Sequence, residues 1–234
     1  MKGAVYVSTG GVTSEKITER VRSLAEQDFK YIELTGGTLS EERFLVKLQA
    51  LKATYGLSFL VHNYFPPPKI PFVFNLASTK KEIRELSIKL ACAAIDICVE
   101  LEAPIYSFHA GFFFDPSTSE LGGAKRRHKL VKPAEGINYF VDSYCLIQEY
   151  SEKKGIQIFV ENNVLDSENY NELGCTKAAM LLDNKDYERL FELIGFNLLL
   201  DTGHLKVSAK TLGLPFAQQF KSLAKKAGFL QISD

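Results

Sequence analysis

Acidic, amide and imidazole side chains stand at the ends of several short apolar runs in this sequence. The run LLLDTGH (198–204), for example, passes from three leucines to Asp201 and His204. Such groups can move protons or hold a divalent cation. The residues that end these runs are Glu33, His62, His109, Glu161 with Asn162 and Asn163, Asp201 with His204, and Gln231 with Ser233 and Asp234.

Each of these residues also has an ordinary structural explanation. A histidine after a strand is more often a loop residue with satisfied hydrogen bonds than a ligand, and Glu33 could form an ion pair in the floor of a barrel. Asp201 and Thr202 could cap a helix, and Asn162 and Asn163 could form turns. The functional interpretation therefore depends on whether the fold gathers these run ends in one place.

The apolar runs predict buried parallel β-strands. Most are apolar throughout rather than alternating, which is typical of strands covered on both faces. Amphipathic segments separate them, and Ile83, Leu86 and Leu90 recur with a helical period in one such segment. The predicted strands are AVYVS (4–8), YIELT (31–35), LSFLVHNY (57–64), PIYSFHA (104–110), IQIFVEN (156–162), FNLLLDT (196–202) and FLQIS (229–233).

The connections between these elements are asymmetric. The predicted helices are followed closely by glycines that suit a left-handed terminal residue, at Gly56, Gly155, Gly195 and Gly228. The predicted strands are followed by long connections, which places loops at their carboxyl ends, where α/β folds bind ligands. Strand and helix alternate seven times without a linker, so we expect one domain over 1–234.

Two α/β folds are compatible with this alternation. A doubly wound sheet usually binds nucleotide through a glycine-rich turn after its first strand, but STGGVTSEK (8–16) lacks the GxGxxG pattern. Loops enlarged on one side favour a (β/α)₈ TIM barrel, here without its eighth β/α unit. A barrel would bring all the polar strand ends around one opening.

Composition narrows the class of protein. The 28 basic and 28 acidic residues give no net charge, which offers little affinity for phosphate and argues against nucleic acid as a partner. The one basic cluster, KRRHK (125–129), is interpreted as a solvated loop or as a phosphate contact. We expect no membrane span, because no stretch approaches about 20 apolar residues. The amino-terminal run is too short for a signal peptide, and four cysteines without a CxxC pair indicate a reduced, cytoplasmic protein.

The motifs LVHNY, SFHAG, FVENN, LLLDTGH and QISD together resemble those of the xylose isomerase-like barrels. This family comprises sugar isomerases and epimerases together with endonuclease IV. The resemblance implies that Glu161 and Asp201 are metal ligands. It places His204 on substrate, as in the epimerases, or on metal, as in the endonucleases. His62 and His109 match histidines that line the site.

The sequence departs from the family pattern in two places. Gln231 occupies the position of a histidine ligand at the end of the seventh strand, and an amide oxygen binds a borderline metal less well than imidazole does. The family's eighth strand supplies a glutamate that has no counterpart before Asp234. We expect either that these residues are a fragment of a longer protein or that another chain closes the gap.

The predicted function is a sugar or sugar phosphate isomerase or epimerase that works through an enediolate. Its catalytic residue would be Glu161. The divalent cation would be Mn²⁺, Mg²⁺, Co²⁺ or Zn²⁺. The alternatives are an abasic-site endonuclease with a zinc cluster, or a non-catalytic barrel whose metal site has decayed. The sequence is compatible with a homo-oligomer and does not fix the oligomeric state. The predicted metal ligands are Glu161, Asp201 and Gln231, and the predicted substrate-binding residues are His62, His109, His204, Asn163 and Glu33.

Overall fold

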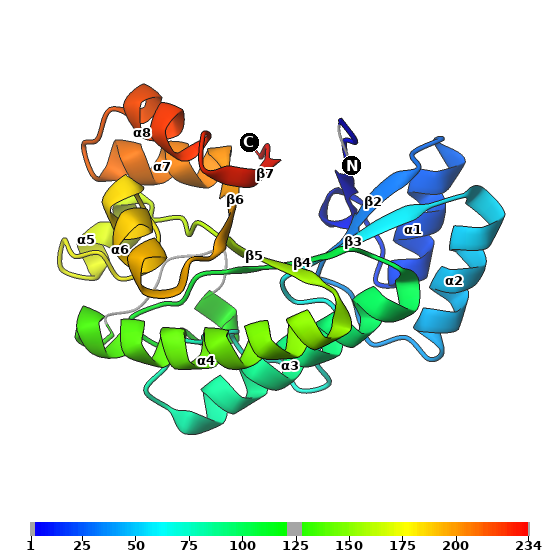
Figure 1. Ribbon diagram of the computed structural model, residues 1–234, viewed down its shortest axis with the longest axis horizontal. Helices are drawn as coiled ribbons and strands as arrows, with labels where there is room; N and C mark the ends of the chain where they lie inside the picture. The colour runs from blue at the N-terminus through cyan, green and yellow to red at the C-terminus, as the bar shows by residue number, and fades with distance from the viewer. Residues whose placement is uncertain (1–2, 121–127, 234) are drawn as a thin grey trace. The chain divides into compact units, whose positions relative to one another are not determined.

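The computed structural model describes residues 3–120 and 128–233 (Figure 1). Seven strands form one sheet, and they follow one another in sequence order. The fold is therefore α/β with seven of the strands of a TIM barrel. The strands are β1 (Val7–Ser8), β2 (Tyr31–Leu34), β3 (Ser58–His62), β4 (Ile105–His109), β5 (Gln157–Glu161), β6 (Asn197–Asp201) and β7 (Ala227–Gln231). The α-helices are α1 (Ile17–Glu26), α2 (Phe44–Tyr55), α3 (Lys81–Leu101), α4 (Pro133–Lys154), α5 (Ser167–Glu172), α6 (Asn184–Ile194), α7 (Thr202–Thr211) and α8 (Phe216–Leu223).

The chain divides into two compact units. The first comprises Met1–Ile70, Lys89–Phe108 and Gln148–Ile158, and the second comprises Pro71–Ile88, His109–Ile147 and Phe159–Asp234. The first boundary, between Ile70 and Pro71, lies in the connection from β3 to α3, and the other four fall inside α3, β4, α4 and β5. The chain therefore passes between the units several times without a separating linker. The expectation of one domain over 1–234 stays a prediction. No helix in the described residues has the length and apolar character that crossing a bilayer requires.

The first unit is built on β2. This strand pairs in parallel with β1 and with β3. Ile32 and Leu34 on β2 are fully buried, as expected for a core strand. Helix α1 buries Ile17, Val21 and Leu24, which are spaced four and three residues apart and therefore share one face. Helix α2 packs against α1, and the two lie side by side in Figure 1.

The second unit contains the paired strands β6 and β7. They are parallel, and their register shifts between Leu198 and Leu199. The three leucines of LLLDTGH are buried, as expected for a core strand. Helix α7 begins at the residue after β6 without an intervening loop, and α8 packs against α7 (Figure 1). This direct junction carries Asp201 and His204 at the carboxyl end of β6.

One glycine prediction was wrong. Gly56, Gly155 and Gly195 have the predicted left-handed conformation, but Gly228 lies inside β7. A Cβ atom at Gly228 would lie 2.8 Å from Cε1 of Phe159, so the neighbouring aromatic ring excludes a side chain there. Strand β7 covers Ala227–Gln231 rather than the predicted 229–233, and because it ends at Gln231, Ser233 falls beyond it.

Candidate metal and substrate site

Strands β4, β5 and β6 end in the polar residues His109, Glu161 and Asp201. Glu161 pairs in register with Leu199 on β6, so the carboxyl ends of β5 and β6 lie at the same edge of the sheet. The apolar residues that precede these polar residues are buried in the core, and Val160, next to Glu161, has no solvent exposure. The strands therefore carry their terminal side chains on rigid backbone. His204 follows in the first turn of α7.

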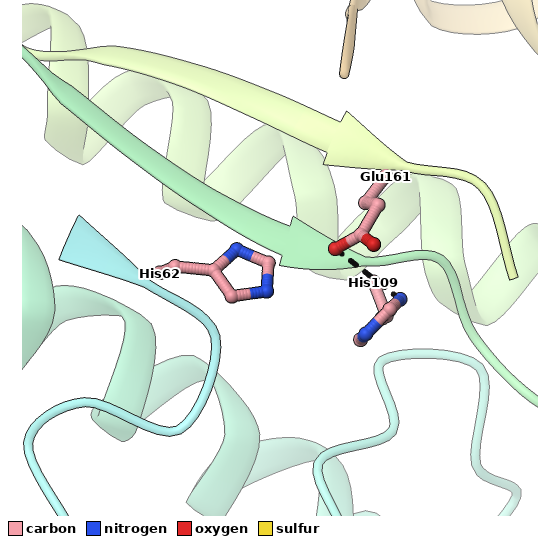
Figure 2. Close-up of side chains that lie close together, drawn as sticks. All are labelled: His62, His109 and Glu161. Atoms are coloured by element: carbon pink, nitrogen blue, oxygen red, sulfur yellow. Dashed lines mark ion pairs between the residues drawn. The ribbon is translucent and has the colours of Figure 1, made fainter. Parts of the chain in front are cut away.

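The Glu161 carboxylate lies between two imidazoles. Figure 2 shows the contact between Glu161 and His109. Oε2 of Glu161 is 3.4 Å from Nδ1 of His109, and its Oε1 is 3.1 Å from Nδ1 of His204. The centroids of the two imidazole rings are 5.3 Å apart. Glu161 has no solvent exposure. A carboxylate taken out of water is a stronger acceptor for protons and cations than one in solvent.

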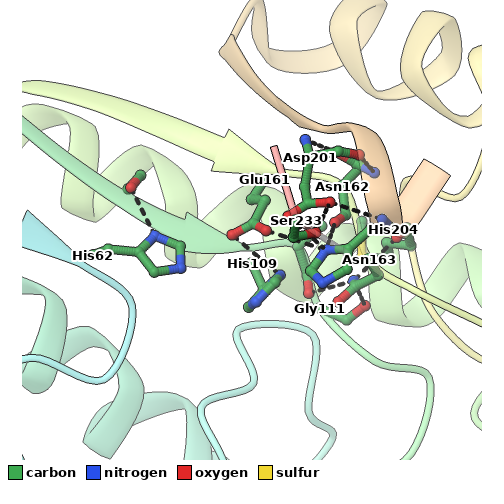
Figure 3. Close-up of polar contacts among 12 residues, drawn as sticks. His62, His109, Gly111, Glu161, Asn162, Asn163, Asp201, His204 and Ser233 are labelled. Carbon is green, nitrogen blue, oxygen red and sulfur yellow. Dashed lines mark hydrogen bonds and ion pairs between the residues drawn. The ribbon is translucent and has the colours of Figure 1, made fainter. Parts of the chain in front are cut away.

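Asp201 has both its predicted structural role and a place in this cluster. Its Oδ1 accepts a hydrogen bond of 2.7 Å from the backbone N–H of His204, which caps α7. The Ser233 hydroxyl lies 2.8 Å from Oδ1 and 2.9 Å from Oδ2 (Figure 3). The helix cap and the hydroxyl together fix the orientation of the carboxylate.

Asn162 joins the end of β5 to the end of β6. Its side-chain Nδ2 donates to the carbonyl of Asp201 at 3.1 Å, and its Oδ1 accepts from the N–H of Asp201 at 2.7 Å. The Asn162 carbonyl lies 3.1 Å from Nδ1 of His204. Asn162 therefore positions two residues of the cluster rather than only forming a turn.

Asn163 braces the loops that follow β4 and β5. Its Nδ2 donates to three backbone carbonyls in the second unit (Figure 3). These are Ala110 at 2.6 Å, Gly111 at 3.3 Å and Met180 at 3.1 Å. The predicted contact of Asn163 with substrate stays a prediction.

The pKa of His204 is raised above the usual histidine value. Burial alone would lower that pKa, but the hydrogen bond and charge of Glu161 and the charge of Asp201 together outweigh burial. Without a cation in the cluster, His204 therefore keeps its proton at pH values above its ordinary range. A cation bound by this imidazole would displace that proton.

The donor atoms of the cluster fit a divalent cation. Glu161, Asp201 and His204 each offer one ligand atom, and these atoms all lie within 4.8 Å of one another. Gln231 is the register partner of Asp201, and its Oε1 is buried with no hydrogen-bond partner among the described residues. A buried oxygen without a donor is costly unless something positive lies against it. Oxygen and imidazole donors of this kind suit Mn²⁺, Mg²⁺, Co²⁺ or Zn²⁺.

Two of the predicted substrate-binding residues belong to the first unit. Glu33 is buried on β2. His62 ends β3 and is buried, with Nδ1 2.8 Å from the hydroxyl of Ser107 on β4 (Figure 3). The substrate-binding roles of Glu33 and His62 stay predictions.

The basic cluster KRRHK lies mostly outside the described residues, which resume at His128. His128 Nε2 is 2.8 Å from Oε1 of the buried Glu120, and its ring lies against Phe114 with the centroids 4.8 Å apart. His128 is therefore packed onto the protein, whereas Lys129 is exposed.

Ser233 and Asn162 lie at predicted strand ends, but the sequence pattern predicted no role in the cluster for either residue. Both are short polar residues directly beside a predicted ligand or strand end. That adjacency is the signal that could have identified them as positioning residues.

Comparison with known proteins agrees with this fold. The model of the xylose isomerase-like TIM barrel family matches residues 21–234. A search of curated proteins found no match.

Solved structures that resemble the chain include several named as epimerases. A D-tagatose 3-epimerase-like protein is 19% identical, with a TM-score of 0.68 over 97% of this chain and 73% of the other. The 3-keto-D-glucoside 4-epimerase of E. coli is 14% identical, with a TM-score of 0.67 over 98% and 78%. A Thermus thermophilus protein soaked with zinc chloride is 16% identical, with a TM-score of 0.61 over 98% and 76%. At such low identity the TM-scores show a shared fold alone, whereas the match to the family model covers most of the sequence. The chain belongs to the xylose isomerase-like TIM barrel family.

Proposed function

We propose that this protein is a divalent-cation-dependent isomerase or epimerase of a ketose or other keto-sugar. The observation that carries the proposal is the buried Glu161 carboxylate, held between His109 and His204 beside Asp201. Two of the solved relatives are named as an epimerase-like protein of a ketohexose and as an epimerase of a keto-glucoside. A sugar with a ketone next to a hydroxyl-bearing carbon is therefore the proposed substrate class, with or without a phosphate group.

The cation would be held by Glu161, Asp201 and His204, with the amide oxygen of Gln231 as a further donor. When bound, the cation supplies positive charge that stabilises the negative charge developing on the substrate oxygens. Three oxygen donors to one nitrogen favour a hard cation such as Mn²⁺ or Mg²⁺ over Zn²⁺.

Glu161 would act as the general base. It would remove the proton from the carbon next to the ketone, and the electron pair of that C–H bond would form the C=C bond of an enediolate. Return of the proton to the neighbouring carbon gives isomerisation, and return to the opposite face by a second acid gives epimerisation. His109 would donate a hydrogen bond to a substrate oxygen from the position it holds 3.4 Å from Glu161.

The remaining predicted contacts complete the proposal. Asn163 is proposed as a group that contacts substrate, while contacts of Glu33 and of His62 with substrate stay predictions from the sequence. Asn163 already holds the loop after β4 through its contacts with Ala110 and Met180. Its replacement would therefore disturb the placement of His109 as well as any substrate contact.

The test is product analysis with Mn²⁺ and a panel of ketoses that includes D-tagatose and D-psicose. The wild-type protein should interconvert at least one pair of sugars, and Glu161→Gln should lower the rate by about 10²- to 10⁴-fold, as expected for loss of a general base. Cleavage of a duplex containing an abasic site, with no turnover of any sugar, would instead establish the endonuclease alternative.

A further inference from the structure

The hydroxyl of Ser233 lies across the carboxylate of Asp201. Its Oγ is 2.8 Å from Oδ1 and 2.9 Å from Oδ2, so either oxygen can accept its single proton. Ser233 lies two residues beyond β7, while Asp201 ends β6. The contact therefore joins two separate segments of the second unit. Asp201 itself is almost completely buried.

Gly203 makes this contact possible. A Cβ atom at residue 203 would lie 2.4 Å from Oγ of Ser233 and 2.7 Å from its backbone carbonyl oxygen. Real Cβ atoms do not approach other atoms so closely, and the carbonyl belongs to the backbone, so any side chain at 203 would push Ser233 away. The glycine in DTGH thus leaves the space through which the segment after β7 reaches Asp201.

We propose that Ser233 is a positioning residue that orients the Asp201 carboxylate for cation binding, with Gly203 providing the space. The inference rests on the proposed cation role of Asp201. A carboxylate oxygen has two lone pairs, so it can accept a hydrogen bond and still bind a cation. Partners that hold a ligating group in place typically contribute 10- to 100-fold to metal affinity.

The experiment measures the dissociation constant of Mn²⁺ by isothermal titration calorimetry on the full chain. Ser233→Ala should weaken binding by about 10- to 100-fold, and Ser233→Thr, which keeps the hydroxyl, should restore most of it. Gly203→Ala should weaken binding to a similar degree by displacing Ser233. Ser222→Ala is the matched control, because Ser222 donates a 2.7 Å, part-buried hydrogen bond to Asn184 in the same unit, outside the proposed cation ligands. Urea midpoints without added cation show whether each variant is folded.

Several results would overturn the inference. If folded Ser233→Ala binds Mn²⁺ as tightly as the wild type, or if Ser233→Thr binds as weakly as Ser233→Ala, Ser233 does not position Asp201 through its hydroxyl. Asp201→Asn and Glu161→Gln separate this failure from failure of the proposed function. If these two variants lose Mn²⁺ while Ser233→Ala retains it, only the positioning role is wrong. If they bind Mn²⁺ normally, the proposed cation site is wrong and the positioning inference falls with it.

Discussion

Replacement of Asn162 by alanine would remove two buried hydrogen bonds between β5 and β6. Asn162 is 2% exposed and Asp201 is 1% exposed, so water cannot replace the lost partners without rearrangement. The Asp201 N–H, now paired with Asn162 at 2.7 Å, would be left unsatisfied. The Asp201 carbonyl would lose its 3.1 Å bond from Asn162 but keep the intrahelical bond that it accepts as the N-cap of α7. The unsatisfied N–H costs about 1–3 kcal/mol and the second lost hydrogen bond about 1 kcal/mol, so the variant should lose about 3 kcal/mol of stability in total. For a chain of this length that corresponds to a fall in Tm of about 6–12 °C.

The assay is urea unfolding followed by circular dichroism, with thermal unfolding as a second measurement. Asn138→Ala is the matched control, because Asn138 is exposed on α4 and its loss should change stability by no more than about 0.5 kcal/mol. The reasoning would be refuted if Asn162→Ala were destabilised by less than about 1 kcal/mol. In that case Asn162 would not hold the carboxyl end of β6 in place.

Three further predictions concern the cation and the pH. Gln231→His should raise the affinity for Zn²⁺ relative to Mn²⁺ by about tenfold or more, because imidazole suits Zn²⁺ better than an amide oxygen does; an unchanged ratio in calorimetry would show that residue 231 is not a ligand. The pKa of His204 is higher in the folded state, so protonated His204 stabilises the cation-free protein. This stabilisation is complete below about pH 6.5, the ordinary histidine pKa, and is lost as the pH rises through the raised pKa of the folded state. Urea midpoints should therefore fall more steeply with rising pH in the wild type than in His204→Gln, and equal slopes would contradict this. Over the same range the affinity of the wild type for Mn²⁺ should increase, because a cation competes with the proton on His204.

Much of the fold could be predicted because its strands are continuous apolar runs. The runs that became β2 to β6 were located to within about two residues at their carboxyl ends. The edge strands were less accurate: β1 contains only Val7–Ser8, and β7 begins at Ala227 because Gly228 belongs to the strand. An edge strand pairs with a neighbour on one side only, so fewer contacts fix where it begins and ends, and strand propensity depends on such context.

The proximity of Glu161 to His109 and His204 could also be predicted from the sequence. Parallel strands place their carboxyl ends at one edge, so polar residues at those ends lie together once the alternation of strands and helices is known. The individual hydrogen bonds within the cluster could not be predicted in this way. The bridges from Asn162 and Ser233 to Asp201 depend on the register of β5, β6 and β7, which is set by long-range packing and cannot be read from any one strand.

The most direct test of the central claim is solvent deuterium exchange. In D₂O with Mn²⁺, proton NMR should show wild-type protein replacing the hydrogen on the carbon next to the ketone of its sugar. Glu161→Gln should slow that exchange by about 10²-fold or more. No exchange with any ketose in the panel, or exchange by Glu161→Gln at the wild-type rate, would contradict the proposed role of this carboxylate.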